Sequence, residues 1–280
     1  LLSRETSILI NNWFMMYFLS VVLIGTVYPI FLEVISSEKI SVGPPFYQKL
    51  IIPFLIPFLL FMTLGTKLKW IKSKIENKNL LIITLIILVI LTFFIVKNLT
   101  TDLLFYTVLI SAAFFLFFTT LKELCIKKFN NVSQTVAHFG FSLLILSILF
   151  NNILSSEITT NMKVGENYIY NKGEIFFKKI EEKKKSNFKS IIALFEIKDE
   201  NGKTVELKPE IRIYNQPLII TSEADIKTTL LEDKFLVMNF IKGEEYFNIR
   251  YQVKPFMIWI WISVLLLSLG GLMSLFKKKI

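Results

Sequence analysis

The segment 136-VAHFGFSLLILSILFNNIL-154 decides the fold, because it is apolar over the length that crosses a bilayer and is followed by a long polar stretch. A transmembrane helix needs about 20 predominantly apolar residues. Residues 155–254 carry 17 Lys or Arg and 16 Asp or Glu, the near balance of an ordinary soluble domain. The sequence therefore predicts a membrane helix that leads directly into a folded domain outside the bilayer.

Further apolar segments lie on both sides of this pair. The chain has 280 residues, of which 53% are hydrophobic, and 27 are Phe, a composition typical of membrane proteins. Hydropathy places spans over Leu9–Leu32, Phe46–Gly65, Leu80–Val96, Leu103–Leu121, Val136–Leu154 and Phe256–Phe276. We expect a mainly α-helical membrane protein with six transmembrane helices and one extracytoplasmic β-rich domain between helices five and six.

The lysines predict the orientation of these spans. Segments 67–78 and 122–128 and the tail 277–279 are basic, whereas the alternate connections carry little more than Lys39 and Lys97. Basic loops stay in the cytoplasm, so both termini are expected there and residues 155–254 outside. The net charge of +10 is thus a topology signal and not a nucleic-acid footprint. The expected parts are 1–154, 155–254, and 255–280 with its basic cytoplasmic tail.

The extracytoplasmic segment reads as a small β-sandwich or barrel. Apolar alternation and turn residues predict strands over Glu174–Lys179, Ser190–Lys198, Thr204–Tyr214, Leu218–Thr221, Phe235–Ile241 and Tyr246–Val253. The charged run Glu181–Lys185 is expected to be a solvated loop tip, with a binding role as the alternative.

His138 is the single histidine of the chain and lies inside the fifth span. An ionisable group within a membrane segment usually serves a site or a polar contact. Metal or haem ligation is one explanation, since neutral imidazole is the commonest metal ligand. A hydrogen bond to a neighbouring helix is the other, and the residues alone leave both open.

Several short strings, in a fixed order, resemble one known family. They are Ser3-Arg4-Glu5, Asn11-Asn12-Trp13, Gly25–Pro29, Ser41–Phe46, Ala137–Gly140, Arg212–Tyr214, Ser222–Ile226, Arg250-Tyr251, Lys254-Pro255, Trp259–Trp261 and Gly270-Gly271. Together they resemble the C-terminal half of CcmF, the haem-lyase membrane subunit of system I cytochrome c maturation. The family's N-terminal half, with its tryptophan-rich haem-handling segment, has no counterpart here. We expect this chain, which begins without Met, to be one half of a split protein or a fragment of a longer one.

The resemblance implies a site for haem b, held in the membrane by one histidine from each half. His138 then corresponds to the axial iron ligand of the C-terminal half, and the second ligand lies outside this chain. Gly140 would let the flat macrocycle approach the helix, with ordinary helix packing as the alternative. Arg4 would reach a haem propionate, with a positive-inside anchor as the alternative.

The resemblance also implies an activity, which is formation of thioether bonds between haem and the two thiols of an apocytochrome c CxxCH motif. The implied partners are the N-terminal half, a haem chaperone, apocytochrome c and other system I subunits, in a bacterial or mitochondrial inner membrane. Without its other half the chain is expected to be inactive as a haem lyase. The alternatives are a haem-free assembly scaffold that docks apocytochrome or a partner subunit and, less favoured, a transporter-like permease, although the paired intramembrane charges of transporters are lacking.

The remaining candidate residues have structural explanations as well as functional ones. Trp13, Trp259 and Trp261 are expected in the interfacial belt, with lining of a haem path as the alternative for the last two. Ser41–Phe46 is expected to form a stiff turn, because its two prolines cannot continue a helix. Cys125 is expected to be inert. No nucleophile–base pair or phosphate-binding loop is recognisable.

Overall fold

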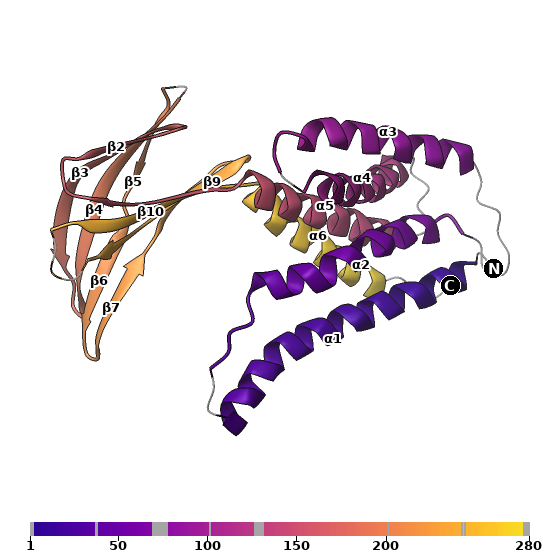
Figure 1. Ribbon diagram of the computed structural model, residues 1–280, viewed down its shortest axis with the longest axis horizontal. Helices are drawn as coiled ribbons and strands as arrows, with labels where there is room; N and C mark the ends of the chain where they lie inside the picture. The colour runs from indigo at the N-terminus through magenta and orange to yellow at the C-terminus, as the bar shows by residue number, and fades with distance from the viewer. Residues whose placement is uncertain are drawn as a thin grey trace. The chain divides into compact units, whose positions relative to one another are not determined.

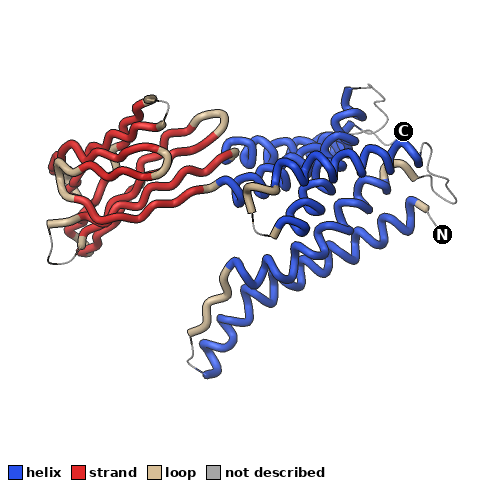
Figure 2. Tube along the Cα trace, turned by 45° about the horizontal axis from the view of Figure 1, so that its top comes forward, coloured by secondary structure: helices blue, strands red, loops and turns tan. Residues whose placement is uncertain are grey.

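The computed structural model describes residues 3–36, 39–68, 78–100, 102–125, 132–200, 202–241, 243 and 245–276. The chain divides into two compact units, one of residues 1–149 with 262–280 and the other of residues 150–261. The first unit is helical, and the second carries all the strands of the described part (Figures 1 and 2). The outer ends of the fifth and sixth helices belong to the second unit, so each of these helices contributes to both.

Six helices in the described part of the chain are long and apolar enough to cross a membrane. They are α1 (Arg4–Ser36), α2 (Pro44–Gly65), α3 (Lys78–Val96), α4 (Leu103–Cys125), α5 (Val132–Leu154) and α6 (Met257–Leu275). The expected fold class, six spans with a β-rich domain between the fifth and the sixth, is confirmed. The largest difference is at α1, which extends beyond both ends of the predicted Leu9–Leu32 because a helix can continue through polar residues that hydropathy does not count.

The predicted turn over Ser41–Phe46 is shorter in the structure, because both of its prolines belong to α2. Gly43 is the extended N-cap residue, and Pro44 and Pro45 form the first helical turn. Proline is tolerated there because the first amides of a helix have no intrahelical acceptor to lose. The prolines therefore start the helix, where the sequence had suggested that they would exclude one.

Small residues bring α1 and α2 close together. The Ser7 hydroxyl donates a hydrogen bond of 3.2 Å to the Phe61 carbonyl oxygen. A Cβ added to Gly65 would lie 2.5 Å from the Ser7 Oγ, and one added to Gly25 would lie 2.7 Å from the Tyr47 hydroxyl. Such close approach is the usual way in which membrane helices gain packing contacts.

The strands form two antiparallel sheets. The first sheet has the order β1-β10-β9-β8, and the second has the order β2-β3-β4-β6-β7, with β5 also paired to β4. The bounds are β1 (Ser156–Met162), β2 (Asn167–Tyr170), β3 (Gly173–Lys184), β4 (Phe188–Asp199), β5 (Thr204–Leu207), β6 (Glu210–Asn215), β7 (Leu218–Glu223), β8 (Asp225–Thr228), β9 (Glu232–Phe240) and β10 (Phe247–Pro255).

The hydrophobic core of this domain contains side chains from both sheets. Phe177 and Phe195 of the second sheet stack with ring centroids 4.2 Å apart, and both are fully buried. Met238 and Ile249 of the first sheet belong to the same cluster and are also fully buried. Burial of apolar side chains on one phase of each strand is what produces the alternation that the sequence showed.

Two details of the strand prediction need correction. The predicted strand Thr204–Tyr214 is interrupted around Pro209, which has no N–H, yet β5 and β6 keep one continuous register along β4. The run Glu181–Lys185 is not simply a loop tip: Glu181–Lys184 are the end of β3, paired with β4 and exposed. Strands tolerate such a charged end because its side chains face water.

Strands β1, β2 and β8 were missed by the sequence prediction. Strand β1 reads SEITTNM, in which Ile158 and Met162 are the only strongly apolar residues. Its short polar pattern does not stand out from a loop, although Ser156, Ile158 and Thr160 are each less exposed than the residues between them. Pairing with β10, which is distant in sequence, is what fixes this segment as a strand.

Replacing Phe195 by Ala should destabilise the β-sandwich strongly. Removal of a fully buried ring leaves a cavity, and the expected loss in free energy of unfolding is about 3–5 kcal/mol. The loss would appear as faster proteolysis of the domain in the purified, intact protein. Ile169→Ala is the control, since Ile169 is 76% exposed and should tolerate truncation. Equal protease resistance of the two variants would contradict the placement of the core.

Candidate functional site

His138 lies on α5, one turn and a half from the beginning of the helix, and its side chain is partly buried. Its Nδ1 atom is fully buried and has no hydrogen-bond partner within the described part of the chain. A buried imidazole nitrogen without a partner is costly, so an unpaired one needs an explanation. Of the two explanations from sequence, a hydrogen bond from Nδ1 to a neighbouring helix is not observed among the described residues.

Charged residues from other helices surround this end of α5. Arg4 Nη2 donates a hydrogen bond of 3.3 Å to Gln134 Oε1, one helical turn before His138. The charges of Glu123, on α4, and of Arg4 both act on the imidazole. The structure thus brings Arg4 and His138, which are far apart in sequence, into one polar region.

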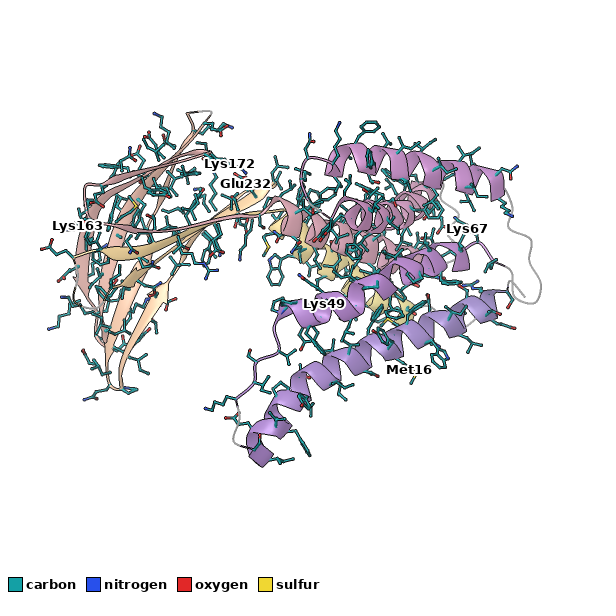
Figure 3. The ribbon with its side chains drawn as sticks, viewed as in Figure 1. Met16, Lys49, Lys67, Lys163, Lys172 and Glu232 are labelled. Atoms are coloured by element: carbon teal, nitrogen blue, oxygen red, sulfur yellow. The ribbon has the colours of Figure 1, made fainter. Side chains whose placement is uncertain are left out.

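Glu123 is itself held by residues that follow α2. It forms an ion pair with Lys67, and the Thr66 hydroxyl lies 3.5 Å from its Oε1 atom. Lys67 is labelled in Figure 3. The start of α1, the ends of α2 and α4 and the start of α5 therefore contribute polar side chains to one region, as expected where ionisable groups in a membrane protein face each other and not lipid. Sequence reasoning did not identify Lys67, Glu123 or Gln134 as neighbours of His138.

Gly140 packs against α6. A Cβ at this position would lie 3.0 Å from Leu266 Cβ and 3.1 Å from the Ser263 carbonyl oxygen. Gly270 makes the reciprocal contact, because a Cβ there would lie 2.7 Å from the Ala137 backbone nitrogen. The geometry fits the helix-packing role of Gly140, and its expected role beside a haem stays a prediction. This packing also fixes the helical segment that carries His138.

Trp13, Trp259, Trp261 and Cys125 are the other residues singled out in the sequence. Trp13 and Trp261 are 79% and 65% exposed, as lipid-facing residues are in the absence of lipid. The Trp259 indole donates a hydrogen bond of 2.9 Å to the Leu230 carbonyl oxygen. Cys125 is exposed at the end of α4. The described residues contain no group of three or more His, Cys, Asp or Glu side chains that could hold a metal ion.

The β-sandwich has a polar cleft of about 430 Å³ that sequence reasoning missed. Its lining includes Tyr170, Lys172, Asp199, Glu232 and Lys234. The Lys234 side chain is only 7% exposed and pairs with Asp199 and Glu232. The alternation along β9 could have revealed it, because Lys234 lies on the same buried face of the strand as Leu236 and Met238. Paired in this way, the cluster satisfies a buried charge and needs no ligand.

Burial also affects a tyrosine near this cleft. Tyr251 of β10 packs next to Tyr170, with ring centroids 6.1 Å apart, and its hydroxyl is buried. Burial raises the pKa of Tyr251 far above its usual value, and the neighbouring Asp199 and Glu232 carboxylates add to the increase. The Tyr251 phenol is therefore harder to ionise than the phenol of an exposed tyrosine.

An integral membrane protein of six spans that carries a β-sandwich between the fifth and the sixth is the class that this fold defines. Residues 153–255 match the family model described as CcmF C-terminal beta-sandwich. Among similar proteins, cytochrome c-type biogenesis protein CcmF of Escherichia coli (strain K12) is 27% identical and aligns with 99% of this chain and 44% of its own length. Cytochrome c-type biogenesis protein ccl1 of Rhodobacter capsulatus is 24% identical over 100% of this chain and 45% of its own length.

A solved structure described as cytochrome c heme lyase CcmF has the same fold. Its TM-score is 0.75 at 21% identity, and the match covers 98% of this chain and 46% of that chain. The resemblance to the C-terminal half of CcmF is thus confirmed along the whole sequence. The chain spans less than half the length of the relatives it matches.

Adding a side chain at Gly270 should separate α5 from α6. Gly270→Leu would place atoms against the α5 backbone, and overpacking of this kind costs about 1–3 kcal/mol. We expect the variant in detergent to aggregate at a lower temperature than the unsubstituted protein. Size-exclusion chromatography after heating would measure the aggregation. Gly271→Leu is the matched control, since a Cβ there meets no atom within 4 Å. Indistinguishable profiles would show that α5 and α6 do not pack through Gly270.

Proposed function

We propose that this chain is one half of a cytochrome c haem lyase and supplies His138 as one axial ligand to a haem b in the membrane. The observation that carries the proposal is the buried Nδ1 atom of His138, which has no partner among the described residues. Similarity to cytochrome c-type biogenesis proteins along 99% of the chain supports haem as the group involved. A single histidine offers one bond to iron, so the other axial ligand is expected from the missing half.

The residues around His138 fit this role. The polar region contains Arg4, whose guanidinium is suited to pairing with a propionate carboxylate, and Arg4 is oriented by its hydrogen bond to Gln134. Glu123 adds a negative charge near the imidazole, which favours an electron-rich ligand. Lys67 partly balances Glu123, so the region does not carry an uncompensated carboxylate.

Haem held in this way would supply one-electron chemistry, which would keep the iron of incoming haem reduced with electrons drawn from quinol. The contribution of this chain is to hold the group through His138 and to keep α5 fixed against α6. We assign no catalytic residue to it. Thioether formation on an apocytochrome c CxxCH motif would occur on the other side of the membrane, so His138 serves electron supply and does not grip substrate.

The proposed arrangement places residues 1–154 and 255–280 in and along a bacterial or mitochondrial inner membrane. Residues 155–254 would lie on the periplasmic or intermembrane side, and both termini on the cytoplasmic or matrix side. The basic loops support this orientation. The N-terminal half is the first partner expected, because relatives are about twice as long as this chain. A haem chaperone, apocytochrome c and other system I subunits are the further partners.

A second candidate function is a haem-free scaffold that docks polypeptide. The observation in its favour is β7, an edge strand whose Leu218, Ile219 and Ile220 are 77%, 48% and 58% exposed. An exposed edge strand offers free backbone groups to an extended segment of another protein. Haem content separates this function from the first, because a scaffold would retain no haem through His138.

His138→Ala should remove most b-type haem from the purified complex with the N-terminal half. The loss of one axial ligand is expected to lower the haem content severalfold, which a reduced pyridine haemochrome spectrum would measure. His138→Gly with added imidazole should restore part of the haem, because the free ring can occupy the vacated position. Ser147→Ala is the control and should retain haem, because the Ser147 hydroxyl donates to the Leu143 carbonyl oxygen within α5 itself. Unchanged haem content in His138→Ala would disprove ligation and favour the scaffold.

Cysteine labelling should show on which side of the membrane each loop lies. In a Cys125→Ser background, Lys203→Cys should react with a membrane-impermeant maleimide in intact cells or mitoplasts. Lys74→Cys, which lies outside the described residues, should react only after the membrane is opened. The physical reason is the retention of Lys-rich loops in the cytoplasm. Labelling of both sites from one side would overturn the proposed orientation.

A further inference from the structure

We propose that the turn between β8 and β9 inserts Leu230 and Leu231 into the lipid bilayer beside the beginning of α6. The insertion requires that α6 crosses the membrane and does not depend on haem binding. It would give the β-sandwich a contact with the bilayer in addition to its two covalent connections to α5 and α6. The occupant of this apolar surface is lipid, at the boundary between headgroups and acyl chains.

The two leucines are presented on a well-ordered turn. Leu230 and Leu231 are 66% and 68% exposed. The Thr229 hydroxyl donates a hydrogen bond of 2.7 Å to the Glu232 carbonyl oxygen, and the Thr229 amide donates one of 2.9 Å to the same oxygen. The apolar side chains therefore project from a closed hairpin end, which costs little conformational entropy when they enter another phase.

Hydrogen bonds tie this turn to the first turn of α6. The Phe256 amide donates to the Leu231 carbonyl oxygen at 2.8 Å, and the Trp259 indole donates to the Leu230 carbonyl oxygen at 2.9 Å. All four residues lie within the unit of residues 150–261. Since α6 begins at Met257, the two leucines lie beside the start of an apolar helix that can span a membrane.

The start of a spanning helix marks the depth at which hydrocarbon begins. Tryptophan prefers this level, and Trp259 lies there with its indole N–H engaged by the turn. Apolar side chains fixed next to it enter the same zone, as they do in interfacial segments that bury about 5–10 Å into the headgroup and acyl boundary. Water would otherwise have to cover two large exposed leucines at the membrane surface.

The carbonyl groups of the two leucines have hydrogen-bond partners, so insertion would not leave them unpaired in lipid. The Leu230 carbonyl accepts the hydrogen bond from Trp259 of α6, and the Leu231 carbonyl accepts the one from Phe256, just before α6. Glu232, labelled in Figure 3, pairs with the buried Lys234 at 3.6 Å. Lys234 thus neutralises a carboxylate that lies next to the inserted leucines.

Leu218 provides a matched comparison. It is 77% exposed at the start of β7, in the turn from β6, and its strand pairs only with β6. This turn is held by the pairing of β7 with β6, in which Asn215 lies opposite Leu218. If exposure alone drew leucines into lipid, both turns would insert. The proposal predicts that only the turn tied to α6 does so.

The test uses the full complex with the N-terminal half, in a Cys125→Ser background, reconstituted into vesicles of phosphatidylcholine and phosphatidylglycerol. Leu230→Cys, Leu231→Cys and Leu218→Cys are labelled singly with an environment-sensitive fluorophore. Lipids brominated near the headgroup are then used as quenchers. We expect a blue-shifted emission and strong quenching at positions 230 and 231, with neither effect at 218. The substitutions leave the backbone hydrogen bonds in place, so the fold should persist, as size-exclusion chromatography would check.

Three outcomes would overturn the proposal. Unshifted, unquenched emission at 230 and 231 would place the turn in water. Blue-shifted emission without quenching would show that protein, such as the other half, covers the leucines instead of lipid. Equal quenching at 218 would show that contact with lipid does not arise from the connection to α6. Haem content of the same preparations reports separately on the proposed function, since none of these positions lies near His138 in the chain.

Discussion

The antiparallel pairing of β1 with β10 is the constraint on which much of the structure depends. Strand β1 begins two residues after α5 ends, and β10 ends two residues before α6 begins. Their register runs from Ser156 opposite Val253 to Met162 opposite Phe247. The two strands therefore hold the ends of α5 and α6 side by side, although about a hundred residues separate them in sequence. The Asn151 side-chain amide adds a hydrogen bond of 2.6 Å to the Pro255 carbonyl oxygen at the same junction.

The same pair of helices is held together again inside the membrane unit. Gly140 and Gly270 remove side chains where the α5 and α6 backbones meet. In lipid, helices gain little from burying apolar area, so close backbone contact between small residues carries much of the association. His138 lies between Ala137 and Gly140, two α5 residues that approach α6 closely. Helix packing thus fixes the segment that carries His138, and the charges of Arg4 and Glu123 act on its imidazole.

The sequence predicted the spans well because a bilayer imposes one simple requirement on each of them, a long apolar run. It predicted the core strands β3, β4 and β9 because their inward residues, such as Phe177, Phe195 and Met238, alternate with polar ones. It missed β1 because that strand is specified by pairing with β10 and carries few apolar residues of its own. It misplaced Pro44 and Pro45 because a proline pair is compatible with both a loop and a helix start.

The candidate site was predictable only in part, and the reason is physical. His138 stands out as a single ionisable ring in an apolar segment, which one span is enough to reveal. Its neighbours Arg4, Lys67 and Glu123 come from three other elements, so only the arrangement of helices brings them together. The ion pair of Lys234 was not predictable for a different reason. The alternation of β9 places Lys234 on the buried face, but its partner Asp199 lies on another strand. A buried ionisable residue can be recognised from sequence when all its sequence neighbours are apolar. It cannot be recognised when the residue that neutralises it is distant in sequence.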